Sequence, residues 1–269
     1  MDAISVTVER GGTVEAIHEV HVVSSAGERR GEAALVCHLR SSMKPLQAIP
    51  FVDGYDDLAT DEIAIACASH EAEPAQLAAV RKVLTRAGVG VDDLENGVQD
   101  GRPDGKLGHN CSGKHAGMLA ACRAHGWPLH PYRDPAHPLQ QRIAQLVSGA
   151  PGIDGCGLPT IAMSLAEMAE LFTTIPRPIV AAMRAHPELI GGSRADDTEL
   201  MQALPGWVAK RGAEGLFCAL SPDGVGWVFK VADGATRGLR PALGQVLGID
   251  AFRTVPVRNS LGEVVGSIR

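Results

Sequence analysis

Ser41 and Lys44 form the first pair of residues in the chain whose types and spacing could do chemistry. They lie three residues apart in the segment RSSMKPLQ (40–47), so on a helix they would share one face. A serine hydroxyl attacks a carbonyl only when a base takes its proton. Lysine can be that base only if its pKa falls by about 3 units, a cost of about 4 kcal/mol that burial or a second ammonium could impose. The alternative is structural, with an N-cap serine and a surface lysine.

A second serine, Ser69, lies in the segment CASHE (67–71), at the joint between two predicted helices. It could simply cap the loop that ends the first helix. The order along the chain favours chemistry, because Lys230 follows on a late predicted strand. A Ser-x-x-Lys motif, then a serine in a helical region, then a late lysine is the layout of serine β-lactamases and penicillin-binding proteins. Val231 follows Lys230 where those proteins have Thr-Gly, so the similarity is one of layout.

Two cysteines in glycine-flanked turns suggest a third constellation. Cys111 lies in HNCSGKHAG (109–117), and Cys156 lies in IDGCGLP (153–159). Two thiolates are half of a zinc site, and without paired finger spacing such a site would be open and of catalytic type. Lys114 could add a ligand only as a neutral amine. Two unrelated thiols are the alternative.

The same stretch differs by one residue from a phosphate-binding loop. His115 stands where that loop requires serine or threonine, and residues 96–107 are too polar to form the buried strand that must precede it. These two departures argue against nucleotide binding.

The composition describes a globular protein of 269 residues, 45% of them hydrophobic, with a net charge of −6. Basic residues are scattered singly, which argues against a nucleic-acid partner. No apolar run reaches the roughly 18 residues of a membrane helix and no signal pattern is visible, so we expect a cytoplasmic protein with reduced cysteines. The chain has only six lysines against nineteen arginines, and lysine alone can become a neutral base. Each lysine therefore merits attention.

The elements that must position these residues follow from hydrophobic periodicity. Alternation predicts strands at both ends of the chain, at 4–8, 17–23, 33–37, 215–220, 226–231 and 264–268. Helical periodicity predicts helices at 60–67, 73–87, 115–125, 138–148, 165–173, 179–185, 197–204 and 237–247, with a long loop at 89–109. We predict an α+β fold in which both chain ends build one antiparallel sheet flanked by helices. The whole chain would be one catalytic unit, with 1–53 and 212–269 as the α/β sheet part and 54–211 as an inserted, mainly helical lobe.

Four motifs together resemble one family: RSSMKPLQ, CASH, HNCSGKHAGM and DGCGLP are similar to the Rhizobium etli-type (class 3) L-asparaginases. Further matches are GWVAKRGAEG (206–215) and FKVADG (229–234). The resemblance implies hydrolysis of the side-chain amide of L-asparagine to L-aspartate and ammonia, by a homodimer with a serine β-lactamase/glutaminase-like fold.

The resemblance also implies roles for individual residues. Ser41 would pair with Lys44 and Ser69 with Lys230 as catalytic pairs. A zinc ion would be bound by Cys111, Lys114 and Cys156, and substrate would be bound by Arg40, Lys114 and Asp154, with Asp154 on its α-ammonium group.

Several questions stay open at this point. The sequence does not decide which serine attacks, or whether zinc is catalytic or structural. A glutaminase or β-lactamase-like serine hydrolase shares the Ser/Lys layout. A non-catalytic zinc-binding module would keep the metal and hydrolyse nothing.

Overall fold

The computed structural model describes residues 1–269, which divide into two compact units. Unit 1 comprises Met1–Cys37, Met163–Thr173 and Gly212–Arg269, and unit 2 comprises His38–Ala162 and Thr174–Arg211. No helix is long and apolar enough to cross a membrane.

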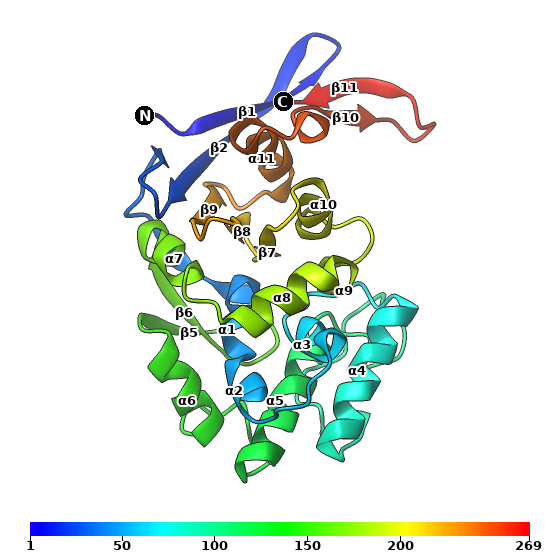
Figure 1. The fold of residues 1–269 in the computed structure, drawn as a ribbon. Helices are drawn as coiled ribbons and strands as arrows, with labels where there is room; N and C mark the ends of the chain where they lie inside the picture. The colour runs from blue at the N-terminus through cyan, green and yellow to red at the C-terminus, as the bar shows by residue number, and fades with distance from the viewer. The chain divides into compact units, whose positions relative to one another are not determined.

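Unit 1 is built around an antiparallel sheet to which both chain ends contribute. Its strands follow the order β10-β11-β1-β2-β9-β8, with β3 paired to β2, and Figure 1 shows the first and last strands side by side. The elements are β1 (Ile4–Arg10), β2 (Thr13–Ser24), β3 (Arg29–Arg30), α7 (Leu165–Phe172), β8 (Leu216–Leu220), β9 (Gly226–Val231), η3 (Thr236–Gly238), α11 (Leu239–Leu247), η4 (Asp250–Phe252), β10 (Val255–Arg258) and β11 (Val264–Ile268). The predicted α+β class, with an antiparallel sheet flanked by helices, is confirmed.

The central strand β9 is covered on both faces. Gly226 lies so close to α7 that an added Cβ would stand 1.9 Å from the Ala169 carbonyl oxygen. Val231, five residues along, points to the opposite face, where its Cγ1 lies 3.5 Å from the position of a Cβ on Gly238. Because helical elements lie on both sides, apolar residues occupy successive positions of this strand instead of alternating with polar ones.

Unit 2 is mainly helical. It contains η1 (Arg40–Met43), α1 (Lys44–Gln47), α2 (Ile49–Asp53), α3 (Thr60–Ala66), α4 (Pro74–Ala87), η2 (Val91–Asp93), α5 (Ser112–His125), α6 (Pro138–Leu146), β5 (Ala150–Ile153), α8 (Arg177–Ala185), α9 (Pro187–Gly191), α10 (Asp196–Ala203) and β7 (Val208–Arg211). Two short strands, β4 (Val36–His38) and β6 (Pro159–Ser164), span the unit boundaries, and β6 pairs with β5.

The helices α3, α4 and α5 of unit 2 pack on one another (Figure 1). Two glycines on one face of α5 allow it to approach α3 closely: a Cβ on Gly113 would lie 2.2 Å from the Ile65 carbonyl oxygen, and one on Gly117 would lie 2.9 Å from the Ala66 Cβ. The close contact fixes where the chain leaves α3 relative to where α5 begins.

The unit boundaries differ from the predicted ones in two places. Residues 38–53, predicted to belong with the sheet, lie in unit 2, because α2 packs on α5: Phe51 is 3.6 Å from the position of a Cβ on Gly117. Residues 163–173, predicted to belong to the helical lobe, lie in unit 1, because α7 packs on β9.

Candidate active site

Ser69 lies in an irregular segment that follows the end of α3. Its backbone N–H donates to the Ile190 carbonyl (2.8 Å), and the backbone N–H of His70 donates to the Asn110 carbonyl (3.2 Å). These bonds tie the segment to the end of α9 on one side and to the loop before α5 on the other. Ser69 is only 3% exposed.

Two lysine amines converge on the hydroxyl of Ser69. The Nζ of Lys44 and the Nζ of Lys210 each donate to its Oγ at 2.8 Å. Neither lysine has any exposed surface. A serine flanked by two desolvated amines has the arrangement in which an uncharged lysine can accept the hydroxyl proton.

Lys44 enters the site from the first residue of α1. Its ammonium also donates to the Ala68 carbonyl (2.5 Å) and to the Asn110 carbonyl (3.4 Å). Burial lowers the pKa of Lys44, an effect that the neighbouring Cys111 opposes and Lys114 reinforces. The Nζ of Lys44 nevertheless has three acceptors, the Ser69 hydroxyl and the carbonyls of Ala68 and Asn110. They match the three N–H bonds of a protonated lysine, so the geometry suits the charged form.

Lys210 enters from β7, whose position is fixed in part by a hydrogen bond from the Ser42 hydroxyl to the Lys210 carbonyl (3.1 Å). Its Nζ also donates to the Arg211 carbonyl (2.9 Å). Burial lowers the pKa of Lys210 to about 7, even though Asp197 acts to raise it. Near neutral pH a large share of the Lys210 side chains is therefore uncharged and able to act as a base.

Arg40 and Asp154 form an ion pair in the same unit. The Nε of Arg40 donates to Oδ1 of Asp154 at 2.5 Å. Arg40 has a left-handed backbone (φ 49°), which is unusual outside glycine and costs conformational energy. Burial alone would raise the pKa of Asp154, but the Lys114 ammonium and Arg40 outweigh it and hold that pKa below its ordinary value.

The sequence model of the L-asparaginase II family matches residues 6–269. The chain belongs to this family. Its membership makes the protein an amidohydrolase enzyme of the asparaginase type, and it confirms the resemblance drawn from the motifs.

Two similar solved structures are described as β-lactamases. A putative β-lactamase from Bacteroides dorei DSM 17855 is 13% identical, with a TM-score of 0.41 over 91% of this chain and 93% of that one. A β-lactamase from Mycobacterium bovis is 14% identical, with a TM-score of 0.33 over 93% of this chain and 95% of that one. No curated protein matches the sequence.

In this L-asparaginase II family member, Ser69 is bonded to two lysines, Lys44 and Lys210, that the sequence did not assign to it. Lys230 lies in unit 1, and its Nζ donates to the carbonyl of its neighbour Val231. The second amine on Ser69 is that of Lys210, which sequence reasoning did not select. Two features could have identified Lys210. It lies in the segment GWVAKRGAEG, which resembles the family's motif, and it lies on a short buried strand.

The predicted contact between Ser41 and Lys44 is also absent. Residues 40–43 form a 3-10 turn and the α-helix begins only at Lys44, so the two side chains are not three residues apart on one regular helix. The Lys44 amine reaches Ser69 instead, and the half-buried Ser41 hydroxyl makes no hydrogen bond. The catalytic roles of Ser41 and Lys230 stay predictions.

The three predicted zinc ligands do lie together. The Nζ of Lys114 is 3.1 Å from the Sγ of Cys156, and Cys156 in turn donates a hydrogen bond to Cys111. That bond, with the nearby Lys44 and Lys114 ammonium groups, holds the pKa of Cys111 well below its ordinary value. Cys111 is therefore the thiolate of the pair, and thiolate sulfur is a preferred zinc ligand.

The other two donors are less ready to bind metal. Burial opposes charge on Lys114, but Cys156, Cys111 and Asp154 together raise its pKa, so it is an ammonium until a metal displaces its proton. No group of three His, Cys, Asp or Glu side chains is placed to hold a metal ion. The two thiols and Lys114 are therefore suitable zinc ligands only if Lys114 acts as the third ligand.

His70 is a neutral positioning group. Its Nδ1 accepts from the backbone N–H of Ala72 (3.1 Å), so Nε2 carries the hydrogen and donates to the Ser112 hydroxyl (2.8 Å). Burial lowers its pKa to about 3. His70 therefore links the segment of Ser69 to the first residue of α5.

Proposed function

We propose that this enzyme hydrolyses the side-chain amide of L-asparagine to L-aspartate and ammonia, with Ser69 as nucleophile and Lys210 as general base. One observation carries the proposal: the Ser69 hydroxyl lies between two buried lysine amines, and the pKa of one of them is about 7. Ser41, the other predicted nucleophile, has no such contact with Lys44, because the Lys44 amine reaches Ser69 instead.

The first chemical step forms an acyl-enzyme. The uncharged amine of Lys210 takes the proton of Ser69 as Oγ attacks the amide carbon, and the oxygen of the amide becomes negatively charged. Lys44 keeps a positive charge beside Oγ and stabilises the negative charge that develops there. The C–N bond then breaks, and the proton held by Lys210 leaves with ammonia.

The second step reverses the proton transfer. A water molecule gives its proton to Lys210 and attacks the ester carbon, and the bond to Ser69 Oγ breaks as that proton returns to the serine. The backbone N–H of Ser69 is already bonded to Ile190, so it is not a donor to the substrate oxygen. The charge on Lys44 therefore matters more here than in enzymes whose nucleophile also supplies a backbone donor.

The substrate's two charged groups have matching partners in the ion pair of Arg40 and Asp154. The Asp154 carboxylate would bind the α-ammonium group, and the guanidinium of Arg40 both orients that carboxylate and can pair with the α-carboxylate of the substrate. Lys114, 3.8 Å from Asp154, adds a further positive charge on the carboxylate side.

A zinc ion, if bound, would be held by Cys111, Lys114 and Cys156. It would supply a Lewis acid able to polarise a substrate oxygen, or a fixed point that shapes the pocket. In its absence the Lys114 ammonium compensates the thiolate charge of Cys111. We also propose, as the family resemblance implies, that the active form is a cytoplasmic homodimer.

A coupled ammonia assay with L-asparagine, L-glutamine and D-asparagine tests the proposed substrate. We expect turnover of L-asparagine well above that of the other two amides. Faster release from L-glutamine would make the protein a glutaminase, and covalent labelling of Ser69 by a β-lactam without ammonia release would make it a penicillin-recognising enzyme. Zinc binding without hydrolysis of any of these amides would support the alternative function, a non-catalytic zinc-binding module.

A further inference from the structure

Asp197 is a fully buried carboxylate that the proposed mechanism has not used. It lies in the first turn of α10, where the partial positive charge of a helix N-terminus favours a carboxylate, and it has no exposed surface. Burying a charge is costly unless it is paired and hydrogen-bonded. The contacts of the Asp197 carboxylate therefore indicate its role.

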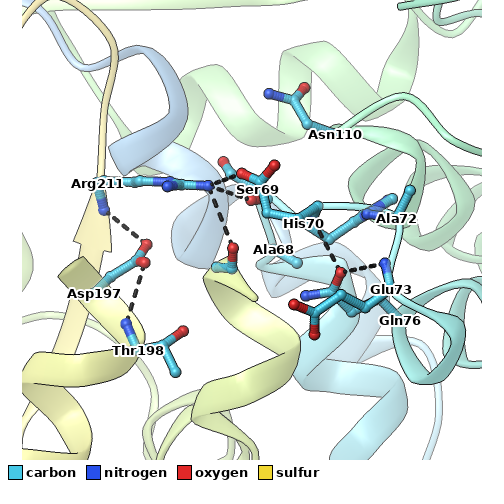
Figure 2. Close-up of polar contacts among 12 residues, drawn as sticks. Ala68, Ser69, His70, Ala72, Glu73, Gln76, Asn110, Asp197, Thr198 and Arg211 are labelled. Atoms are coloured by element: carbon cyan, nitrogen blue, oxygen red, sulfur yellow. Dashed lines mark hydrogen bonds and ion pairs between the residues drawn. The ribbon is translucent and has the colours of Figure 1, made fainter. Parts of the chain in front are cut away.

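The carboxylate is fixed by two backbone donors and faces the Lys210 amine. Oδ1 accepts from the backbone N–H of Thr198, and Oδ2 accepts from the backbone N–H of Arg211, both at 3.2 Å (Figure 2). Oδ2 also lies 3.7 Å from the Nζ of Lys210. Both ends of this ion pair are completely buried, so solvent screens the attraction very little.

The fold reserves space for this carboxylate. An added Cβ on Gly191 would lie 2.1 Å from Oδ1 of Asp197, closer than any atom could approach without a shift. Gly191 is also the last residue of α9, and its carbonyl accepts from Nη2 of Arg211 at 3.3 Å. The end of α9 therefore packs directly against the Asp197 carboxylate and restricts its position.

Arg211 connects the same carboxylate to the nucleophile's own backbone. Its Nη2 donates to the Ser69 carbonyl at 3.1 Å (Figure 2). The same Nη2 pairs with Oε1 of Glu71 at 2.5 Å. Because its backbone N–H also holds Asp197, one residue fixes the distance between the carboxylate and the serine segment.

We propose that Asp197 is a positioning residue that completes a Ser69–Lys210–Asp197 triad. This inference rests on the proposed function of Ser69 and Lys210. Nucleophile, base and a third group that orients the base are the recurring parts of activated-serine sites. The Lys210 amine contacts both other groups, with Nζ 2.8 Å from the Ser69 Oγ and 3.7 Å from the Asp197 Oδ2.

The role of Asp197 is to stabilise the ammonium that Lys210 becomes. When the Ser69 proton moves to Nζ, the buried amine gains a positive charge, and the equally buried Asp197 carboxylate lies beside it. The hydrogen bonds from two backbone N–H groups hold the carboxylate in place beside the amine.

Other charged or titratable groups also act on Lys210. Lys44 and Arg211 oppose its protonation, whereas Cys111 and Asp197 favour it, with Asp197 the stronger of the two. Cys67, at the end of α3, is buried with its pKa raised by burial, so it is an uncharged thiol. Removal of Asp197 should therefore leave the amine beside two cations, and its pKa should fall.

The test measures the pH dependence of Ser69 reactivity in the intact protein. A fluorophosphonate forms a bond between Ser69 Oγ and phosphorus and expels fluoride, while the serine proton passes to Lys210. The labelling rate, followed by mass spectrometry across pH 5 to 9, reports the fraction of uncharged amine. We compare wild type with Asp197→Asn, and we use Asp196→Asn as a control that removes one negative charge from the same helical turn.

In Asp197→Asn, the midpoint of the acid limb should fall by about one pH unit or more, and the plateau rate should drop about tenfold or more because a weaker base remains. The midpoint of Asp196→Asn should move by less than half as much. An unchanged midpoint in Asp197→Asn, or an equal shift in both variants, would overturn the triad.

A second pair of variants covers the case in which Asp197→Asn does not fold. Gly191→Ala keeps every charge but forces the Asp197 carboxylate to move, whereas Gly97→Ala adds the same methyl where nothing lies within 4 Å. We expect Gly191→Ala to lower both the midpoint and the plateau rate of labelling relative to Gly97→Ala. Identical profiles for the two would refute the inference.

The labelling assay also separates this inference from the proposed substrate. If wild type labels at Ser69 with the expected pH dependence but releases no ammonia from asparagine, the substrate is wrong and the triad stands. If ammonia is released and Asp197→Asn leaves the labelling profile unchanged, the substrate stands and the triad is wrong.

Discussion

Replacement of Lys210 by arginine should abolish most of the activity. Arginine keeps the positive charge and a long side chain but cannot give up its proton, so Ser69 would lose its base while retaining a cation on each side. Loss of a general base costs about 100- to 10,000-fold in kcat, equivalent to about 3 to 5 kcal/mol. Lys230→Arg is the matched control, because the Lys230 amine donates to the Val231 carbonyl of its own strand.

The pH profile of the wild-type enzyme should show the same base. Because burial lowers the pKa of Lys210 to about 7, about half of its amine is uncharged at pH 7 and only about a tenth at pH 6. The kcat for ammonia release from L-asparagine should therefore fall about tenfold for each pH unit below the midpoint.

A steady-state ammonia assay from pH 5 to 9 measures both effects. We expect Lys210→Arg to be nearly inactive at every pH and Lys230→Arg to keep the wild-type profile within a few-fold. The reasoning is refuted if Lys230→Arg is the inactive variant and Lys210→Arg turns over normally, because Lys230 would then be the base that the sequence layout first suggested.

Further predictions concern the nucleophile, the stability and the thiols. Ser69→Ala should reduce ammonia release at least about 1,000-fold and Ser41→Ala much less; equal losses, or a larger loss for Ser41→Ala, would show that Ser69 is not the sole attacking group. The folded pKa of Lys210, about 7, lies below its ordinary value of 10.5, so between these pH values the unfolded chain holds the extra proton and this residue makes stability rise with pH. Urea unfolding at pH 7 and pH 9 should show a smaller rise in Lys210→Met than in wild type, and an identical rise in both would contradict the buried amine. Protein purified without chelator should contain zinc that Cys111→Ser loses and Cys37→Ser retains; metal analysis that finds equal zinc in the two variants would remove Cys111 from the site.

The sequence predicted the fold class because the terminal strands carry the period-two pattern of a sheet. It also predicted where α4 ends, since Gly88 follows the last helical turn with a left-handed backbone (φ 64°). It could not assign α7 to unit 1, because an amphipathic helix does not reveal in its own residues which partner its apolar face will cover.

The site was predictable where short motifs carry its residues. The motif around Cys111 and Lys114 and the turn around Asp154 meet in the fold, and two predicted substrate-binding residues, Arg40 and Asp154, form an ion pair. The choice between Lys210 and Lys230 was beyond the sequence, since both are lone lysines on short buried strands near the end of the chain. Only the path of β7 beside η1 turns Lys210 toward Ser69.

The two small residues on α5 have a consequence for how this enzyme tolerates change. Gly113 and Gly117 contain no reactive atom, yet they let the helix that begins beside the thiol pair rest directly on the helix that ends beside Ser69. A single methyl group at Gly113 would separate the two helices and carry the Asn110 carbonyl away from Lys44, with every reactive side chain still present. The spacing of the reactive atoms is thus encoded partly by residues without functional groups, and activity can be lost through substitutions that no inspection of the reactive side chains would reveal.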